Sequence, residues 1–324
     1  MSKSFLKIMK RKVIQIAEST QLISLPRRWA MKYNVKKGDE LEVIEKDNSL
    51  EITTNQKESM SEITINITGL NRTSIYHTLR SAYQRGYDII NVKFDNKATI
   101  HYRTGENVLV SKLLHQELQR WVGMQIIEQK ENYFVFKSIS KPSFEEYDLM
   151  FRRACLLLID ACDEFVRAAE KKDEATLQSM DEKFYTILTF INYCQRLLNK
   201  VGHSEKYKNS LLYSILICLN QVGDILRYGA RDLLVMDKIN PKTAKLIEEI
   251  FSTMRMYYDL YYKFELQKFS EIYKKRDNII REIAKISGKI PTEDLMLLVY
   301  CRQMLEVMIS AIKVTVTYYL EESA

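Results

Sequence analysis

Glycine and proline are scarce in this chain, and this scarcity limits how often the backbone can turn. The 324 residues include 9 glycines and 4 prolines, against roughly 7% and 5% in average usage. Few turns favour long helices, and residues 142–324 show helical periodicity that breaks near Gly202, Pro241, Gly288 and Pro291. Apolar residues make up 46% of the chain, which excludes disorder as its main state. The length allows two or three domains.

The breaks predict six helices in the C-terminal region, at about 143–171, 173–200, 205–237, 241–268, 269–287 and 292–322. In the third of these, apolar residues recur at three- and four-residue steps from Leu211 to Leu226, which gives one apolar face. The helix lengths roughly repeat after three helices, so we predict two three-helix units in tandem. The aromatic residues of Met254–Phe264 also follow helical steps. For them we favour core or dimer packing over a docking site for another protein.

The positive charge of the chain is concentrated at its beginning. The formal net charge is +7, but residues 1–37 alone carry ten cations and one anion, a local net charge of +9. Such a cluster favours a polyanionic partner, because bound phosphates release their counterions. By charge alone, a solvated basic surface is an equal alternative.

Short strand signals follow this basic start. Val13–Ile16 and Gln21–Leu25 predict two strands, and Pro26 is suited to open a short helix at Arg27–Tyr33. Residues 41–52 predict a hairpin that turns at Asp47, Asn48 and Ser49. About 45 residues with strands this short cannot bury a stable core alone. We therefore predict that this segment needs a second copy of itself.

The same segment resembles the SpoVT/AbrB swapped-hairpin family, in the form seen in archaeal members. The anchors are Ser19, Thr20, Ser24, Leu25, Pro26, Trp29, Lys37, Gly38 and Asp39, within the run RKVIQIAESTQLISLPRRWAMKYNVKKGDELEVIEKDNSLEI. The resemblance implies an intertwined homodimer that binds double-stranded DNA. The DNA-contacting residues that it implies are Arg11, Lys12, Arg27 and Arg28, and we add the neighbouring cations Lys10 and Lys32 to the predicted DNA-binding set. Gln21 and Leu22 stand where bacterial members often place an arginine, so any sequence preference stays open. The alternative is a hairpin that serves only to dimerise.

The middle stretch, residues 61–140, alternates strand and helix signals. We predict a helix at Ser74–Arg85, capped by Asn71 or Thr73 and ended by Gly86, and a second at Val108–Trp121. The predicted strands are 63–67, 87–94, 99–102, 124–129 and 133–139. No phosphate loop, dinucleotide fingerprint or catalytic constellation stands out. His77, His101 and His115 are scattered, and we assign them no role.

The C-terminal region resembles the PhoU family of phosphate-uptake regulators over about 143–322. The similar segments are MDEKFYTILTFINYCQRLLN, residues 180–199, and LNQVGDILRYGARDLL, residues 219–234. PhoU proteins often hold metal ions on paired acids four residues apart, which lie on one helix face. Here the corresponding pairs are Asn220 with Asp224 and Glu306 with Ser310, so each has one acid. We predict that no metal is bound. We favour a capping or surface role for Asp224 and Glu306 and keep them as weak candidates for metal ligands.

The five cysteines form no CxxC pair. We expect reduced thiols in a core; a metal or redox pair at Cys155 and Cys162, seven residues apart, is the alternative. The longest charge-free stretch in the helical part, Asn209–Gly223, is 15 residues and falls short of the ~20 that a membrane span needs. The N-terminus lacks the pattern of a secretory signal. We expect a cytoplasmic protein without membrane insertion.

The expected architecture is therefore multidomain. It consists of a small β-rich swapped-hairpin domain at 1–55, a small α/β connecting domain at 60–140, and an all-α PhoU-like domain of tandem three-helix bundles at 143–324. The leading hypothesis is a non-enzymatic, cofactor-free DNA-binding transcriptional regulator linked to phosphate homeostasis. The first alternative is an adaptor that regulates a phosphate transporter component or a signalling protein without binding DNA. The second is a metal-loaded storage or sensing bundle. We expect no enzyme, because no nucleophile has a neighbouring base.

Overall fold

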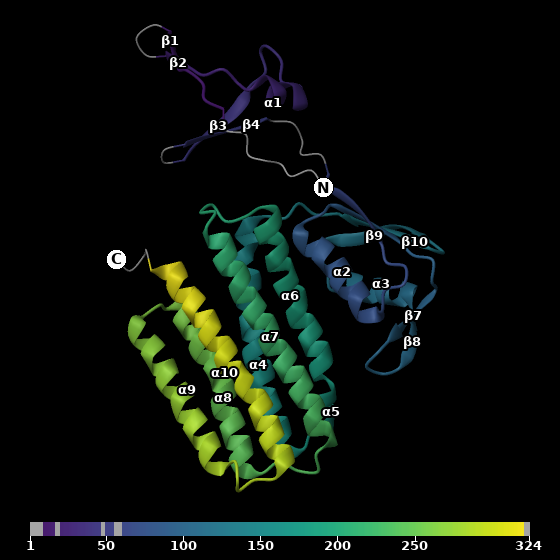
Figure 1. The fold of residues 1–324 in the computed structure, drawn as a ribbon, viewed down its shortest axis with the longest axis vertical. Coiled ribbons are helices and arrows are strands. Elements are labelled where there is room, and N and C mark those ends of the chain that lie inside the picture. Colours follow the sequence, from purple (N-terminus) through teal and green to yellow (C-terminus); the bar gives the residue numbers. More distant parts are fainter. Residues whose placement is uncertain (1–8, 17–19, 47–48, 55–59, 321–324) are drawn as a thin grey trace. The chain divides into compact units, whose positions relative to one another are not determined.

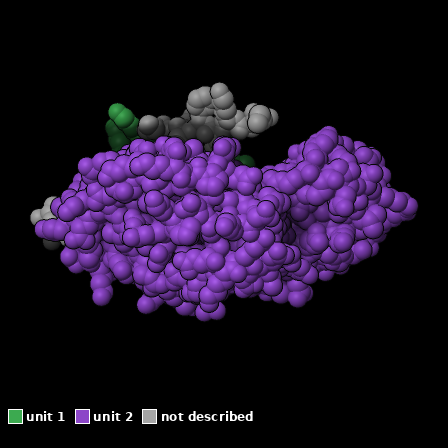
Figure 2. Space-filling model, turned by 90° about the horizontal axis from the view of Figure 1, so that it is seen from below, with its two compact units in different colours: residues 1–59 green, residues 60–324 purple. Residues whose placement is uncertain are grey.

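The computed structural model describes residues 9–16, 20–46, 49–54 and 60–320. The chain divides into two compact units, residues 1–59 (unit 1) and residues 60–324 (unit 2) (Figures 1 and 2). Unit 2 contains both the α/β stretch and the helical region that the sequence predicts as separate domains. The predicted turn at Asp47 and Asn48, the anchor Ser19 and the predicted boundary at residue 55 lie outside the described residues.

Unit 1 consists of two small antiparallel strand pairs and one short helix. Strand β1 (Ile14–Ile16) pairs with β2 (Thr20–Leu22), and β3 (Leu41–Lys46) pairs with β4 (Ser49–Thr54). Helix α1 (Arg27–Lys32) begins directly after Pro26, as its fixed φ predicts. The second predicted strand ends at Leu22 rather than Leu25.

The first part of unit 2 is a four-stranded sheet with two helices. Its order is β5-β6-β10-β9, formed by β5 (Glu62–Asn66), β6 (Ile89–Lys93), β9 (Met124–Lys130) and β10 (Tyr133–Ser138). Strands β5 and β6 are parallel and are joined by α2 (Arg72–Arg85), while β10 is antiparallel to both of its neighbours. Asn71 caps α2 by accepting hydrogen bonds from the amides of Thr73 and Ser74, and Gly86 ends it with φ 95°. Both signals were readable in the sequence.

A separate hairpin projects from this region, and its second strand differs from the sequence prediction. Strand β7 (Ala98–His101) pairs with β8 (Glu106–Leu109), and α3 (Val110–Leu118) follows without a break. The sequence predicted that this helix begins at Val108. The residues before Val110 are held instead by pairing with β7, a partner that periodicity cannot show. Gly105 at the turn has φ 71°, which glycine adopts without strain.

The second part of unit 2 is a helical bundle. Its helices are α4 (Tyr147–Lys171), α5 (Glu174–Gln178), α6 (Met180–Lys200), α7 (Lys208–Val235), α8 (Pro241–Tyr262), α9 (Leu266–Ile286) and α10 (Thr292–Tyr319). The predicted helix at 173–200 is divided at Ser179. The break predicted at 268/269 is wrong: it falls at 263–265, where Lys263 and Glu265 leave helical geometry without any glycine or proline.

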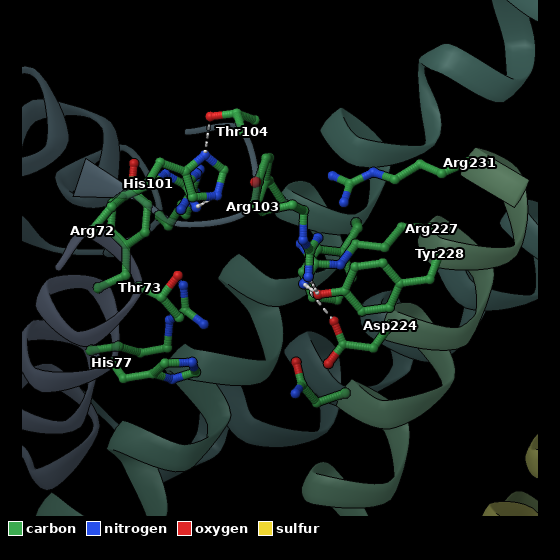
Figure 3. A pocket seen from close by; sticks show the side chains of 16 residues that line it. Arg72, Thr73, His77, His101, Arg103, Thr104, Asp224, Arg227, Tyr228 and Arg231 are labelled. Carbon is green, nitrogen blue, oxygen red and sulfur yellow. Dashed lines mark hydrogen bonds and ion pairs between the residues drawn. The ribbon is translucent and has the colours of Figure 1, made fainter. Parts of the chain in front are cut away.

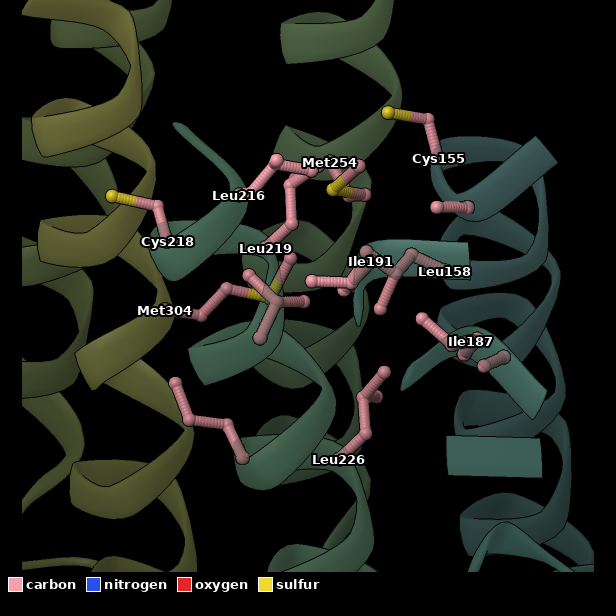
Figure 4. Close-up of a cluster of buried hydrophobic side chains, with 14 of the residues drawn as sticks. Cys155, Leu158, Ile187, Ile191, Leu216, Cys218, Leu219, Leu226, Met254 and Met304 are labelled. Atoms are coloured by element: carbon pink, nitrogen blue, oxygen red, sulfur yellow. The ribbon is translucent and has the colours of Figure 1, made fainter. Parts of the chain in front are cut away.

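One apolar core runs through the bundle. It joins residues of all seven bundle helices, and the examples Leu158, Ile191, Leu219, Met254 and Met304 come from five of them (Figure 4). Because α7 packs against α10, the two predicted three-helix units share this core. Tyr257 and Tyr261 of the aromatic run are buried in it as well.

The five cysteines are free thiols and all are buried, as expected. Burial raises the pKa of the Cys155 and Cys162 thiols far above the usual range. These two cysteines therefore pack as small apolar side chains. No cluster of three or more potential metal ligands occurs in the described part of the chain.

The sheet region and the bundle meet where α2 packs against α6 (Figure 1). Arg196 of α6 is 1% exposed and donates hydrogen bonds to the carbonyl oxygens of Tyr83 and Tyr87, at 2.8 and 2.9 Å. Beside it, Lys200 Nζ lies 2.6 Å from Asp88 Oδ1. These contacts tie the end of α2 to the bundle.

Two bundle helices, α7 and α10, are long and apolar enough to span a membrane by length and composition alone. Half of the apolar window in each is buried within the bundle, and the two helices pack against each other. Core helices of soluble proteins meet the same criteria, so these features are consistent with a soluble protein.

Candidate nucleic-acid interface and an arginine-lined cavity

Unit 1 presents the six predicted DNA-binding residues on its surface. Lys10, Arg11 and Lys12 lie in the extended segment before β1, and the other three predicted cations lie in α1. All six side chains are exposed, and none of them forms an ion pair with a carboxylate among the described residues. Their charge is therefore available to an anionic partner.

Local geometry places the cations of α1 on adjoining faces of the helix. Arg28 and Lys32 are four residues apart and share a face, and Arg27 lies about 100° around the axis. The Lys32 ammonium lies 5.0 Å from the ring centroid of Tyr33. The turn after α1 is fixed by Gly38, with φ 94°, and by Asp39, which accepts a hydrogen bond from the Lys36 amide at 2.8 Å.

Unit 1 also leaves its apolar side chains uncovered. No side chain that the structure describes in this unit is buried. The large apolar residues that remain exposed are Met9, Val13, Ile14, Ile16, Leu22, Ile23, Met31, Val43, Ile44 and Leu50. A segment of this kind lacks a core of its own, as the sequence predicted.

Unit 2 contains a cavity of about 620 Å³ between its sheet region and its bundle. We call it the arginine cavity, after six lining residues: Arg72, Arg80, Arg103, Arg120, Arg227 and Arg231. Figure 3 shows side chains of α2 and the β7–β8 hairpin facing those of α7 across it. The wall from the bundle also includes Phe184 and Tyr185 of α6.

Three carboxylates contact the guanidinium groups of this cavity. Glu117 is fully buried and bonds to both Arg80 and Arg120, with closest approaches of 3.0 and 2.9 Å. The other two pairs are Asp224 with Arg227, at 2.8 Å, and Asp181 with Arg231, at 2.5 Å. Six arginines and three acids leave a formal net charge of +3.

Aromatic rings hold several of these arginines in place. The Arg120 guanidinium lies 3.6 Å from the ring centroid of Tyr185. Tyr228 lies under Arg103 and Arg227, at 4.6 and 4.5 Å, and its hydroxyl accepts a hydrogen bond from each. Stacking and hydrogen bonding together orient a guanidinium before any ligand arrives.

His101 lines the cavity between Arg72 and Thr104. Its Nε2 lies 3.5 Å from Arg72 Nη1 and its Nδ1 lies 3.1 Å from Thr104 Oγ1. Because arginine can only donate, Nε2 accepts, and the proton on Nδ1 points to Thr104. Burial, followed by the charges of Arg72 and Arg103, lowers the pKa of the imidazole.

Comparison with known proteins gives one family match, to residues 14–59. The matching family model is described as antidote-toxin recognition MazE, bacterial antitoxin. This match supports the predicted swapped-hairpin domain at the N-terminus and is consistent with a DNA-binding regulator. Neither curated proteins nor solved structures give a match to the chain. The PhoU resemblance stays a prediction.

The two acids weighed as metal ligands are both engaged by arginines. Asp224 lines the arginine cavity, beside Asn220, and pairs with Arg227. Glu306 is exposed and lies 2.7 Å from Arg276 of α9. Asp224 is thus an ion-pair partner at the cavity whose side chain keeps 35% of its surface exposed, and its interpretation as a capping or surface residue stays a prediction.

Sequence reasoning missed the arginine cavity. His77 and His101, to which we assigned no role, both line it. Its arginines come from four separate segments between residues 72 and 231, so no local motif joins them. The one available signal was the four-residue spacing of Arg227 and Arg231, which places both on one face of α7.

Proposed function

We propose that this chain is a dimeric DNA-binding regulator whose helical unit responds to a signal in phosphate homeostasis. The observation that carries the proposal is that unit 1 combines uncovered apolar side chains with unpaired cations. The first feature calls for a second copy of the segment, and the second calls for a polyanion.

The apolar side chains of unit 1 are arranged so that a second copy can cover them. Ile14 lies opposite Leu22 in the β1–β2 pair, and Val43 lies opposite Ile52 in the β3–β4 pair. Residues directly opposite in such pairs share a face of the sheet. Ile14, Leu22 and Val43 are 57%, 45% and 58% exposed. Burying such a side chain completely contributes roughly 1.5–3 kcal/mol, and about half of each remains to be covered, so interlocking two copies stabilises both by the corresponding fraction.

Dimerisation also doubles the charge. Six cations from each copy give twelve on one assembly, and each phosphate that they neutralise releases counterions. Contacts of this kind position a protein on the duplex without reading its sequence. The family match at residues 14–59 supports this use of the segment.

The link to phosphate homeostasis is supported by the resemblance of residues 143–322 to PhoU proteins. A bundle in the same chain as a dimeric DNA-binding module can favour one dimer geometry when it binds its signal. The adaptor alternative predicts the same bundle with a hairpin that only dimerises.

A salt titration of duplex binding tests the proposal. Full-length protein is titrated onto a fluorescent DNA duplex at several salt concentrations, and its mass is measured by light scattering. We expect the mass of two chains. With Arg27→Ala and Arg28→Ala together, four charges leave the dimer, and the slope of log K against log[salt] should fall by up to about 3.6.

The matched control is Arg281→Ala with Lys289→Ala, which removes two exposed cations of unit 2. This control should bind DNA as the unsubstituted protein does. A dimer that shows no affinity for duplex at low salt would refute DNA binding and favour the adaptor. An unchanged slope in the Arg27/Arg28 variant would remove these residues from the interface.

A further inference from the structure

The arginine cavity holds positive charge that the protein itself does not neutralise. Among the described residues, Arg72 and Arg103 form no ion pair with a carboxylate. Glu117 offsets only one of the two charges of Arg80 and Arg120. Arg72 is half-buried and Arg103 is exposed, but six guanidinium groups around one cavity raise the positive potential there, and this potential attracts anions. This arrangement therefore favours an anionic occupant.

Each of the two unpaired arginines is held against an aromatic ring. The Arg72 guanidinium stacks on Tyr76 of its own helix at 4.6 Å. Arg103 extends from the β7–β8 turn to Tyr228 of α7, at 4.6 Å from the ring and 3.0 Å from the hydroxyl. Because aromatic rings already hold both guanidinium groups, the two arginine side chains lose little conformational entropy when an anion binds.

The residue type indicates which anion fits. All six cations that line the cavity are arginines, and the planar guanidinium matches phosphate oxygens two at a time. A phosphoryl group carries about −1.5 to −2 charges near neutral pH, so two of them offset the net +3. The volume of about 620 Å³ lies within the range of small-molecule sites.

We propose that the arginine cavity is a binding site for a small anion with at least two phosphoryl groups, such as a nucleoside diphosphate, a nucleoside triphosphate or pyrophosphate. Arg72 and Arg103 are its principal ligands to phosphate. Arg227 adds a further donor from the bundle, because its buried Nε has no hydrogen-bond partner.

Occupancy of this cavity would join two parts of unit 2. Arg72 belongs to α2 and Arg103 to the β7–β8 turn, whereas Arg227 belongs to α7. An anion bound by all three draws the sheet region and the bundle together. The proposal of an anion-binding site depends only on the cavity. The idea that this anion is the signal to which the regulator responds rests on the proposed function.

Isothermal titration calorimetry of the full-length protein in phosphate-free buffer tests the site. The probes are ATP, pyrophosphate, orthophosphate and adenosine. We expect ATP or pyrophosphate to bind at least about tenfold more tightly than orthophosphate, and adenosine to give no heat. If ATP binds more tightly than pyrophosphate, the ligand is a nucleotide. If ATP and pyrophosphate bind equally, the phosphoryl groups provide the affinity.

Arginine substitutions locate the binding. Arg72→Gln with Arg103→Gln should weaken binding about 100-fold, because each charge-assisted hydrogen bond contributes about a factor of ten or more. Arg85→Gln is the matched control, since Arg85 is exposed on the same helix but outside the cavity. If circular dichroism shows that the double variant does not fold, Arg103→Gln alone replaces it, because Arg103 is exposed.

Three results would overturn the proposal: no heat with either multiply phosphorylated probe, orthophosphate bound as tightly as pyrophosphate, or full affinity in the Arg72/Arg103 variant. The hairpin variant Arg27→Ala with Arg28→Ala separates this proposal from DNA binding. It should bind the phosphorylated probe normally whether or not it binds duplex, so the failure of one proposal does not imply failure of the other.

Discussion

Arg196 is a buried charge at the contact between the sheet region and the bundle. Its guanidinium donates to the Tyr83 and Tyr87 carbonyl oxygens and lies 4.9 Å from the ring centroid of Tyr83. Burial lowers its pKa, which reflects the cost of removing the charge from water. Arg196→Met keeps the apolar stem of the side chain and removes the donors together with the charge.

The size of the effect follows from what each carbonyl retains. The Tyr83 carbonyl still accepts a hydrogen bond from the Gly86 amide at 3.0 Å, whereas the Tyr87 carbonyl loses the one partner described for it. A hydrogen bond to a charged group contributes about 1.5–3 kcal/mol, and a buried unsatisfied carbonyl costs about 1–3 kcal/mol. Relief of the buried charge offsets part of this loss. We expect Arg196→Met to reduce the free energy of unfolding by about 3 kcal/mol.

Urea unfolding followed by tryptophan fluorescence measures this change. The chain has two tryptophans, and in a Trp29→Phe background only Trp121 remains. Its ring stacks on Tyr83 with centroids 5.2 Å apart, so its emission reports this contact directly. With an m-value near 3 kcal/mol/M for a unit of this size, the midpoint should fall by about 1 M.

The matched control is Arg153→Met, an exposed arginine on the neighbouring helix α4. Substitution there should change the free energy of unfolding by no more than about 0.5 kcal/mol. If both variants unfold at the same urea concentration, the guanidinium of Arg196 does not stabilise the contact, and the reasoning above is refuted.

Two further predictions concern packing and pH. A Cβ at Gly223 would lie 2.6 Å from the Phe184 ring, so Gly223→Ala should lower the free energy of unfolding by about 1–3 kcal/mol. The control Gly288→Ala, with open space around it, should be neutral or stabilising. Equal thermal unfolding midpoints for the two variants would contradict this prediction. Burial opposes ionisation of Asp88, but hydrogen bonds, foremost from Lys200, outweigh it and lower the pKa of that carboxyl. Its stabilisation should therefore be present at neutral pH and decline below about pH 4, so the difference in melting temperature from Asp88→Asn should shrink on acidification; a constant difference would count against it.

The sequence predicted most elements of unit 2 because their signals are local. Asn71 and Gly86 mark the two ends of α2 through hydrogen bonds and backbone angles that involve only neighbouring residues. The apolar face of α7 follows from helical periodicity in the same way. The break between α8 and α9 was misplaced because it carries neither glycine nor proline, and strand β8 was missed because it depends on pairing with β7.

For unit 1, the sequence predicted the secondary structure. It also predicted that the segment cannot form a stable core without a second copy. Short strands and an excess of cations are visible in the order of residues. The structure adds that the cations are exposed and that Ile14, Leu22 and Val43 remain uncovered.

The chain's order of residues by itself determined where most of its helices lie, where its charge is concentrated and that its first segment cannot form a core alone. Only the tertiary structure decided that Arg72, Arg103 and Arg227 share one cavity, and that Asp224 pairs with an arginine there. The reason is physical: helix ends and apolar faces arise from interactions a few residues apart, whereas the cavity arises from segments more than a hundred residues apart, brought together by packing of α2 against α6.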